Sequence, residues 1–403
     1  MATKNTFGIK VFSEIGKLKE VIVQRPGAEL ENFDINKRSH FLMDGDLDYI
    51  QAGKEHDEFV KILKKNNVKV HLMENLFIET WKKIDKNKKL NFIKKFVLET
   101  KIKQPNYSQK ITNFLLKLSN NPKLLIRKLI EGISYLDLMK GGKKDYITEP
   151  LDNIYFQRDG YASIGNNVSI HHMKYNIRNR ETLIYELVFS NHPKFFNTKQ
   201  VYSRNSKLSL EGGDVFPYTK ETLVVGVSER TTLKAIANLA KNMIKEQTKF
   251  KQIIAINVPK TGRLMHLDTW LTMLDKNKFL YSPIAVKSFK FWKINLESKT
   301  VKVEAILNKN LKQVLEMIIK RKPILIPVAG NYSSNDVKRE TKYDGTNFLV
   351  LRPGVVVGFD RNRHTIDALK KAGITVYSFT GDELSLGEGN ARCMSMPIIR
   401  EDY

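Results

Sequence analysis

The sequence predicts an α/β protein in which a hairpin–helix–strand module of roughly 50–70 residues recurs about five times, with a helical segment inserted after the first copy. Short apolar runs alternate with helical stretches along most of the 403 residues. Two copies also share letters, since Val224–Gly226 and Val356–Gly358 each precede a helical stretch. In contrast, Leu, Ile and Phe recur at helical spacing from about Leu76 to Met139, where the β pattern is weak. Such modules typically form a closed array whose edges meet at a central axis, so one site can draw residues from distant parts of the chain.

The first module begins with a buried strand at Val21–Val23, which ends at Pro26-Gly27. A helix over Tyr49–Lys65 follows, and Asn66-Asn67 stops it. The chain then returns as a strand at Val68–Met73. This order is a strand–helix–strand unit.

The inserted segment is expected to hold several helices, because Pro105 and Pro122 interrupt its helical pattern. It is also strongly basic, with 17 Lys and Arg against 4 Asp and Glu from Lys82 to Lys144. That is about half of the net charge of +25. The excess is typical of a solvated lysine-rich face, and it also predicts weak, nonspecific binding of anions by residues 82–144.

The later modules repeat the same order of elements. The expected strands are Asn153–Phe156, a hairpin over Ser163–Ile170, Lys207–Leu210, Val215–Phe216, Thr222–Val227, Ile253–Val258, Thr269–Leu274, Phe279–Tyr281, Ile324–Val328, Asn347–Leu351, Val355–Gly358 and Thr375–Phe379. The expected helices are Asn179–Val188, Glu229–Lys245, Leu311–Lys320 and Thr365–Lys371. We therefore divide the chain into residues 1–75 (first module), 76–148 (basic helical insertion) and 149–403 (remaining modules and a C-terminal cysteine loop).

Composition favours a soluble globular protein, with 41% hydrophobic and 28% charged residues. We expect no membrane span, because no run approaches the roughly 18 apolar residues that one needs. Charged residues interrupt Met1–Val23, so it does not read as a signal peptide. We therefore expect a reducing, cytoplasmic location.

Cys393 is the only cysteine in the chain, so it forms no intrachain disulfide. It follows a loop with two glycines, Gly387 and Gly389, in which a ligand can approach the backbone closely. The thiol is therefore either an inert buried side chain or a nucleophile.

Three polar clusters at expected strand ends are candidates to serve this thiol: Arg158-Asp159, Glu211–Asp214 and His266-Leu267-Asp268. Each has a structural alternative, respectively an ion pair, a hairpin turn and a surface pair. His266 and Asp268 share a face if the backbone is extended there. No spacing among the other histidines indicates a metal site, and we expect no metal or cofactor. The order of His266 before Cys393 is the reverse of a papain-like hydrolase.

Several motifs resemble arginine deiminases of the mycoplasma type, and the resemblance runs nearly from end to end. They are Val11–Gly16, Glu211–Phe216, Val227–Thr231, Met265–Leu274, Asp344–Asn347, Leu351–Val356 and Gly389–Pro397. The resemblance implies the pentein fold, an α/β propeller of five ββαβ modules with an inserted helical domain. It also implies hydrolysis of L-arginine to L-citrulline and ammonia in a homodimer or higher homo-oligomer.

The resemblance further implies roles for single residues. Cys393 would attack the guanidinium carbon and form a covalent amidino intermediate, while His266 acts as general acid and then as general base. Asp159 and Asp268 would hold the guanidinium nitrogens, and Glu211 would support the charged form of His266. The residues implied for the amino-acid end of the substrate are Arg178, Arg230, Asn153 and Leu42.

Three positions depart from the family pattern: Gly45, Gly160 and Glu388. Glycine at 160 replaces a usual proline and is expected to loosen the backbone after Asp159. Glu388 lies in the loop expected to close over the site. Two alternatives therefore stay open: another guanidine-modifying enzyme, such as an agmatine deiminase or an amidinotransferase, or a diverged binding protein that acts through its basic segment.

Overall fold

The computed structural model describes residues 8–43, 45–139, 141–142, 145–260, 262, 264–284 and 286–403. Within them, five sheets share one arrangement, in which a central strand pairs antiparallel with one neighbour and parallel with the other. Strand by strand, these sheets are β19 (Ser395–Arg400), β1 (Leu18–Val23) and β2 (Lys69–Leu72); β5 (Tyr161–Ile164), β6 (Asn167–Ile170) and β7 (Lys199–Tyr202); β8 (Val215–Pro217), β9 (Thr222–Val227) and β10 (Gln252–Asn257); β11 (Leu271–Met273), β12 (Lys278–Tyr281) and β15 (Ile324–Pro327); and β16 (Leu349–Arg352), β17 (Val355–Phe359) and β18 (Thr375–Phe379).

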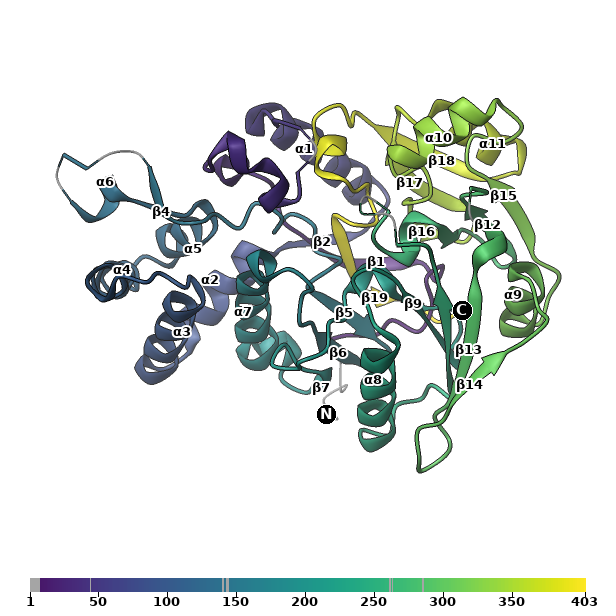
Figure 1. Cartoon of the computed structure of the whole chain (residues 1–403), viewed down its shortest axis with the longest axis horizontal. Coiled ribbons are helices and arrows are strands. Elements are labelled where there is room, and N and C mark those ends of the chain that lie inside the picture. Colours follow the sequence, from purple (N-terminus) through teal and green to yellow (C-terminus); the bar gives the residue numbers. More distant parts are fainter. Residues whose placement is uncertain are drawn as a thin grey trace.

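In each sheet a helix lies on the connection from the central strand to its parallel neighbour, as the hairpin–helix–strand pattern predicts. These helices are α1 (Tyr49–Lys65), α7 (Asn176–Asn191), α8 (Leu233–Lys245), α9 (Leu311–Ile319) and α11 (Arg363–Lys371). The bounds of α1 follow from local chemistry, because the Asp48 carboxylate accepts hydrogen bonds from the N–H groups of Ile50 and Gln51. Sheets and helices together form a mixed α/β fold (Figure 1).

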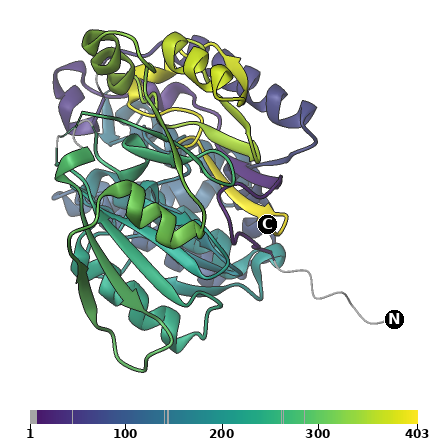
Figure 2. The ribbon, with the colours of Figure 1, turned by 90° about the vertical axis from the view of Figure 1, so that its right-hand side faces the viewer.

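The C-terminal strand joins the two ends of the chain. β19 lies beside β1, so the last described strand completes the first sheet (Figure 2). Arg400 strengthens this closure by donating to the carbonyls of Gly16 at 2.7 Å and Val350 at 2.9 Å. As a result, Cys393, two residues before β19, is held against segments from both ends of the sequence.

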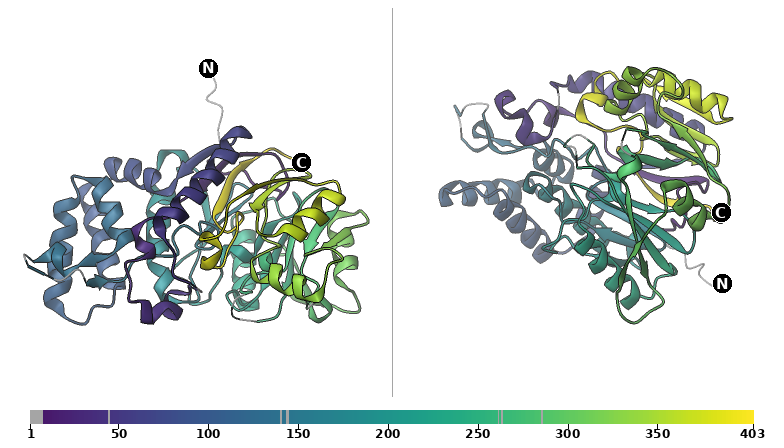
Figure 3. Two further views of the ribbon diagram at one scale, coloured as in Figure 1. Left: turned by 90° about the horizontal axis from the view of Figure 1, so that it is seen from above. Right: turned by 45° about the vertical axis from the view of Figure 1, so that its right-hand side comes forward.

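The inserted helices stand beside the sheets at one end of the molecule (Figure 1; Figure 3, left). They are α2 (Met73–Lys83), α3 (Lys86–Glu99), α4 (Pro105–Leu118) and α5 (Pro122–Glu131), followed by β3 (Ile133–Ser134), α6 (Tyr135–Leu138) and β4 (Tyr146–Thr148). Pro105 and Pro122 start α4 and α5, as expected, because proline fits the first helical turn. Phe77, Trp81 and Phe92 pack their rings together between these helices. Among the described residues, no helix is long and apolar enough to cross a membrane.

Some expected elements differ in the structure. Asn153–Phe156 is a series of turns rather than a strand, with Phe156 N–H donating to the carbonyl of Asn153. Lys207–Leu210 is irregular, and the strand of that module is β7. α8 begins at Leu233 rather than Glu229, because Thr232 caps it through the N–H of Ala235.

Other elements were not expected from the sequence. Two strands, β13 (Lys290–Asn295) and β14 (Val303–Ile306), extend the third sheet, and α10 (Ser334–Lys342) precedes β16. The strand β19 was not expected either; it contains Pro397 and is an edge strand of its sheet, where proline is tolerated. The short 3-10 helices are η1 (Ala28–Leu30), η2 (Ile35–Phe41), η3 (Pro193–Phe195), η4 (Gly212–Asp214), η5 (Leu267–Thr269), η6 (Val286–Ser288) and η7 (Leu384–Gly387).

Candidate active site

Cys393 lies in the buried loop between η7 and β19, with 4% of its surface exposed. Its backbone is fixed on both sides: its N–H donates to Asn347 Oδ1 at 2.9 Å, and its carbonyl accepts from the N–H of Arg158. Glycine is required at 389, because a Cβ there would lie 2.4 Å from the Phe156 ring. The loop therefore presents one rigidly placed thiol.

The thiol has a carboxylate neighbour, Asp268, which comes from η5. Cys393 Sγ lies 3.7 Å from Asp268 Oδ2 and donates to it. Burial, reinforced by the charges of Asp268 and Asp159, raises the pKa of Cys393 well above its ordinary value. Burial likewise raises the pKa of Asp268, although Arg392 opposes the rise from 3.3 Å away. The resting cysteine is therefore a thiol at neutral pH.

His266 is the cap residue of η5 and is also buried. Its Nε2 lies 2.8 Å from Glu211 Oε2, and its Nδ1 lies 3.8 Å from Asp159 Oδ1. Burial opposes a charged ring, yet Asp159 and the hydrogen bond with Glu211 outweigh it and raise the pKa of His266 to about 9. The ring is therefore protonated at neutral pH and can donate a proton. The backbone is not extended here, because Asp268 lies inside η5, yet both side chains reach the site.

Glu211 lies just before η4 and is fully buried. Its Oε2 also accepts from Arg230 Nη1 at 3.2 Å, and its Oε1 accepts from the N–H of Lys174. Burial alone would raise the pKa of Glu211, but the charges of Arg230 and His266 hold that pKa well below its usual range. Glu211 is thus an ionised anchor for the imidazolium.

Asp159 joins this cluster from the turn before β5. Its Oδ2 accepts from Arg178 Nη1 at 2.7 Å, while Arg178 also makes two hydrogen bonds to Glu181, at 3.0 and 3.1 Å. The expected looseness after Asp159 is not observed. A Cβ at Gly160 would lie 2.3 Å from the Tyr185 ring, and the Gly160 carbonyl accepts from the N–H of His171.

Two carboxylate oxygens in the site are buried without a hydrogen-bond donor among the described residues: Asp159 Oδ1 and Asp268 Oδ1. A buried acceptor without a donor costs about 1–3 kcal/mol, so such atoms are unusual outside functional sites. Both lie within electrostatic reach of the thiol. The arrangement fits a planar cation rich in N–H groups, placed above Cys393 Sγ.

The residues predicted for the amino-acid end of a substrate lie beside this cluster. Asn153 donates from Nδ2 to the carbonyl of Phe41 at 2.8 Å, and its own carbonyl accepts from Arg178. Leu42 is half-buried, has φ of 60° and packs against the hydrophobic cluster that contains Cys393. The Arg230 guanidinium lies over the Tyr175 ring, 4.7 Å from its centroid, and no described residue accepts a hydrogen bond from its Nε.

The segment Leu384–Gly389 lies beside the thiol, since a Cβ at Gly389 would lie 2.9 Å from the Cβ of Cys393. A Cβ at Gly45 would meet the Leu386 side chain at 3.1 Å, and one at Gly387 would lie 1.7 Å from the Tyr155 hydroxyl. Glu388 has φ of 64° and acts on Tyr155 electrostatically. The chain segment after Met43 includes Asp44, which lies outside the described residues.

Sequence reasoning missed several partners of this cluster, which are Glu14, Asn347, Tyr155, Glu181 and Arg392. Arg392 pairs with both Glu14 and Asp268. The signal for Glu14 and Asn347 was their place inside motifs that carried the family resemblance. No pattern within the sequence shows which candidate catalytic residue each of these five partners contacts.

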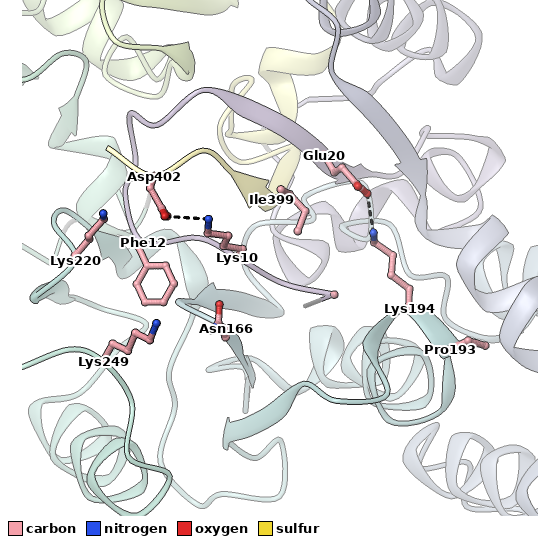
Figure 4. Close-up of a pocket in the computed structure, with 11 residues that line it drawn as sticks. Lys10, Phe12, Glu20, Asn166, Pro193, Lys194, Lys220, Lys249, Ile399 and Asp402 are labelled. Atoms are coloured by element: carbon pink, nitrogen blue, oxygen red, sulfur yellow. Dashed lines mark ion pairs between the residues drawn. The ribbon is translucent and has the colours of Figure 1, made fainter. Parts of the chain in front are cut away.

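A large cavity of about 750 Å³ lies elsewhere, near the two ends of the described chain (Figure 4). Its lining includes Lys10, Phe12, Lys194 and Lys249 but no cysteine or histidine, so it is not the candidate active site. In the part of the chain that the structure describes, no three His, Cys, Asp or Glu side chains form a metal-binding group.

Comparisons with known proteins agree with this chemistry. The family model described as arginine deiminase matches residues 40–400. The arginine deiminases of Metamycoplasma arthritidis and Metamycoplasma hominis are each 46% identical over 398 residues, which cover 98% of this chain and 97% of theirs. The arginine deiminase of Borrelia garinii is 36% identical over 406 residues, with 98% of both chains covered.

Solved structures extend the likeness of the fold. A dimethylarginine dimethylaminohydrolase adduct matches with a TM-score of 0.52 at 15% identity, covering 94% of this chain and 99% of that one. The amidinotransferase SxtG from Microseira wollei matches with a TM-score of 0.55 at 16% identity, covering 98% of each chain. At such low identity these matches concern the fold alone.

Proposed function

The chain belongs to the arginine deiminase family, and we propose from this premise that it hydrolyses the C–N bond of L-arginine to give L-citrulline and ammonia. One structural observation supports this reaction at the candidate site. Two buried carboxylate oxygens without a hydrogen-bond donor, Asp159 Oδ1 and Asp268 Oδ1, lie beside a single thiol. A guanidinium supplies N–H donors in one plane, which matches two carboxylates that must both be satisfied.

The first half of the reaction follows from the protonation states. Cys393 donates to Asp268 Oδ2, so that oxygen can take the thiol proton as the cationic substrate arrives and offsets the nearby negative charges. The thiolate then forms a C–S bond with the guanidinium carbon. The C–N bond to a terminal nitrogen breaks, and His266 gives that nitrogen its proton, so that ammonia leaves.

The second half reverses the proton transfer. His266, now neutral, removes a proton from water, whose oxygen bonds to the amidino carbon. The C–S bond breaks as the new hydroxyl gives its proton to solvent and becomes the carbonyl of citrulline, and the sulfur recovers the proton that Asp268 held. Glu211 stays ionised throughout and fixes the ring through Nε2.

For the substrate carboxylate, Arg230 is the better placed of the two predicted arginines. The donors of Arg178 are largely occupied by Asp159, Glu181 and the Asn153 carbonyl. Arg230 donates to Glu211 through Nη1, and its Nε, 3.8 Å from Glu229 Oε1, makes no hydrogen bond within the described part of the chain. Asn153 and Leu42 then line the side of the α-amino group.

The finer architecture is part of the proposal. The five like sheets support a pentein propeller with pseudo-fivefold symmetry, with residues 1–75 and 149–403 in the propeller and 76–148 as the inserted basic helical domain. We also propose a cytoplasmic enzyme without a cofactor that forms a homodimer or higher homo-oligomer. Light scattering coupled to size-exclusion chromatography tests the oligomer directly.

Citrulline formation from arginine tests the function, with Cys393→Ser as the matched variant. We expect turnover by the native chain and at least about a thousandfold loss in the variant. Quenching the native enzyme during turnover should give an amidino adduct on the peptide that contains Cys393. Agmatine and an amidine acceptor serve as rival substrates, and a preference for either one would contradict the proposal.

A second candidate role rests on the exposed lysines of α2 to α5 and of the α3–α4 connection, such as Lys83, Lys86, Lys94, Lys101 and Lys110. We propose that this face binds polyanions weakly and without sequence preference. None of the candidate site residues comes from α2 to α5, so the two roles can be tested separately.

A further inference from the structure

The motif Asp344–Asn347 lies against both the candidate nucleophile and its carboxylate neighbour. Asn347 Oδ1 accepts from the backbone N–H of Cys393 at 2.9 Å. The adjacent Thr346 donates its hydroxyl to the backbone carbonyl of Asp268 at 2.8 Å. Neither residue is exposed. Two neighbouring side chains thus hold two groups that are 125 positions apart in the sequence.

The segment that carries these side chains has little freedom. Gly345 N–H donates to the carbonyl of Glu340 at the end of α10, and a Cβ at Gly345 would lie 2.7 Å from that carbonyl oxygen. Asn347 also accepts from the N–H of Arg392 through its own carbonyl, at 3.2 Å. Asn347 therefore holds the cysteine loop at two successive residues.

Stability alone does not account for Asn347. A backbone N–H can only donate, so the atom facing Cys393 N must be Oδ1, and Nδ2 lies on the other side of the amide. That Nδ2 is buried without an acceptor among the residues that the structure describes. Leaving a buried donor unpaired costs about 1–3 kcal/mol, which cancels what one neutral hydrogen bond contributes.

We propose that Thr346 and Asn347 form a bracket that sets the distance between Cys393 Sγ and Asp268 Oδ2, and that both act as positioning residues for the hydrolysis of arginine. This inference rests on the proposed function. Each bond anchors the backbone of one member of the pair, whose side chains lie 3.7 Å apart. The thiol can pass its proton to Asp268 only near that distance, and a displacement of about 1 Å can cost roughly a hundredfold in rate.

The kinetic test uses Thr346→Val, Asn347→Ala and the double variant. Each single change should lower kcat about 10- to 100-fold while KM for arginine changes less than about threefold. Both bonds hold the same distance, so their effects should not multiply. The kcat of the double variant should be less than about threefold below that of the slower single variant. Thr80→Val is the matched control, since it removes an equally buried bond from a threonine hydroxyl to a carbonyl, that of Leu76 in α2. The control should lose stability but keep kcat.

A second readout needs no turnover: the rate at which iodoacetamide alkylates Cys393 as a function of pH. The charged and titratable groups that act on this thiol are Asp268, Asp159, Asp344, Arg392, Arg158 and Tyr155. When either bond of the bracket is lost, Asp268 drifts from the sulfur and disfavours the thiolate less. The alkylation midpoint should therefore move to lower pH in Thr346→Val and Asn347→Ala, but not in Thr80→Val.

Two results would overturn the bracket: unchanged kcat in both folded single variants, or losses that multiply in the double variant with an unmoved alkylation midpoint. A failure of the proposed function would be distinguished from a failure of the bracket by its results. It would show as a native chain that makes no citrulline, while the alkylation measurement would still report whether the bracket controls the thiol.

Discussion

At the scale of single residues, Gly387 and Tyr155 make the sharpest prediction. Gly387→Ala places a methyl group 1.7 Å from the Tyr155 hydroxyl, so we expect a loss of about 1–3 kcal/mol in the free energy of unfolding and a lower kcat. In a Tyr155→Phe background the same change should cost clearly less, because that hydroxyl is gone and the closest remaining atoms are ring carbons of residues 155 and 156, at 3.1 and 3.3 Å. Urea denaturation and citrulline assays on the four proteins measure this coupling.

Tyr155→Phe alone is the control for that pair. The Tyr155 hydroxyl is buried without a hydrogen-bond partner among the described residues, so its removal should cost little stability. An equal cost of Gly387→Ala in both backgrounds would show that the loop moves away from the ring instead.

His266 makes the second prediction at this scale. Its pKa is raised from 6.5 to about 9 in the folded state, so its contribution to stability is fully present below pH 6.5 and is lost as the pH rises through about 9. The contribution amounts to roughly 3 kcal/mol. Between pH 6 and 9.5, the native chain should therefore lose more unfolding free energy than His266→Gln does. Equal losses would mean that the ring is neutral in the native protein.

In an NMR titration, Glu211→Gln should lower the midpoint of the His266 ring.

The sequence predicted which residues form the candidate active site better than it predicted which residues hydrogen-bond to them. Cys393, His266, Glu211, Asp159 and Asp268 lie together as expected, because each sits in a motif at the end of an element. The partners that hold them could not be predicted from spacing. Asn347 reaches Cys393, and Thr346 reaches Asp268, only because the turn between α10 and β16 packs against both segments.

At the scale of elements, local chemistry decided which boundaries could be predicted. α1 begins and ends where expected, since Asp48 caps it and Asn66 follows it. The side-chain pattern of Asn153–Phe156 predicts a strand, but the hydrogen bonds of this segment are those of successive turns. Apolar content predicts burial in both cases and does not distinguish a strand from a buried turn.

The packing of α7 against the turn before β5 gives a prediction at this scale. Gly160→Ala should destabilise the protein by about 1–3 kcal/mol, because its Cβ would lie 2.3 Å from the Tyr185 ring of α7. Tyr185→Leu should recover part of that loss in the double variant, with Tyr185→Leu alone as its reference. Unfolding in urea measures all four proteins. If Gly160→Ala is neutral, the ring has room to move and the glycine is a conservative replacement.

At the scale of the whole molecule, charge is distributed unevenly over a fold that carries a net charge of +25. The candidate active site is rich in buried carboxylates, whereas the basic helices lie at one end of the molecule (Figure 3). An arginine cation is therefore repelled by the whole chain and attracted only within the site. The helices α2 to α5, in contrast, expose lysines to solvent, and these lysines are available to bind polyanions.

This distribution predicts that α2 to α5 carry most of the binding to a polyanion such as heparin or single-stranded DNA. Phosphate or sulfate contacts release counterions, so affinity should fall steeply between roughly 50 and 200 mM salt. Replacing Lys83, Lys86, Lys94 and Lys101 by glutamine should flatten the slope of log affinity against log salt by about one unit for each lost contact. The matched control replaces Lys290, Lys299, Lys302 and Lys309, which are equally exposed around β13 and β14. Equal flattening by both sets would assign the binding to net charge alone, whereas salt-independent affinity would exclude an electrostatic origin.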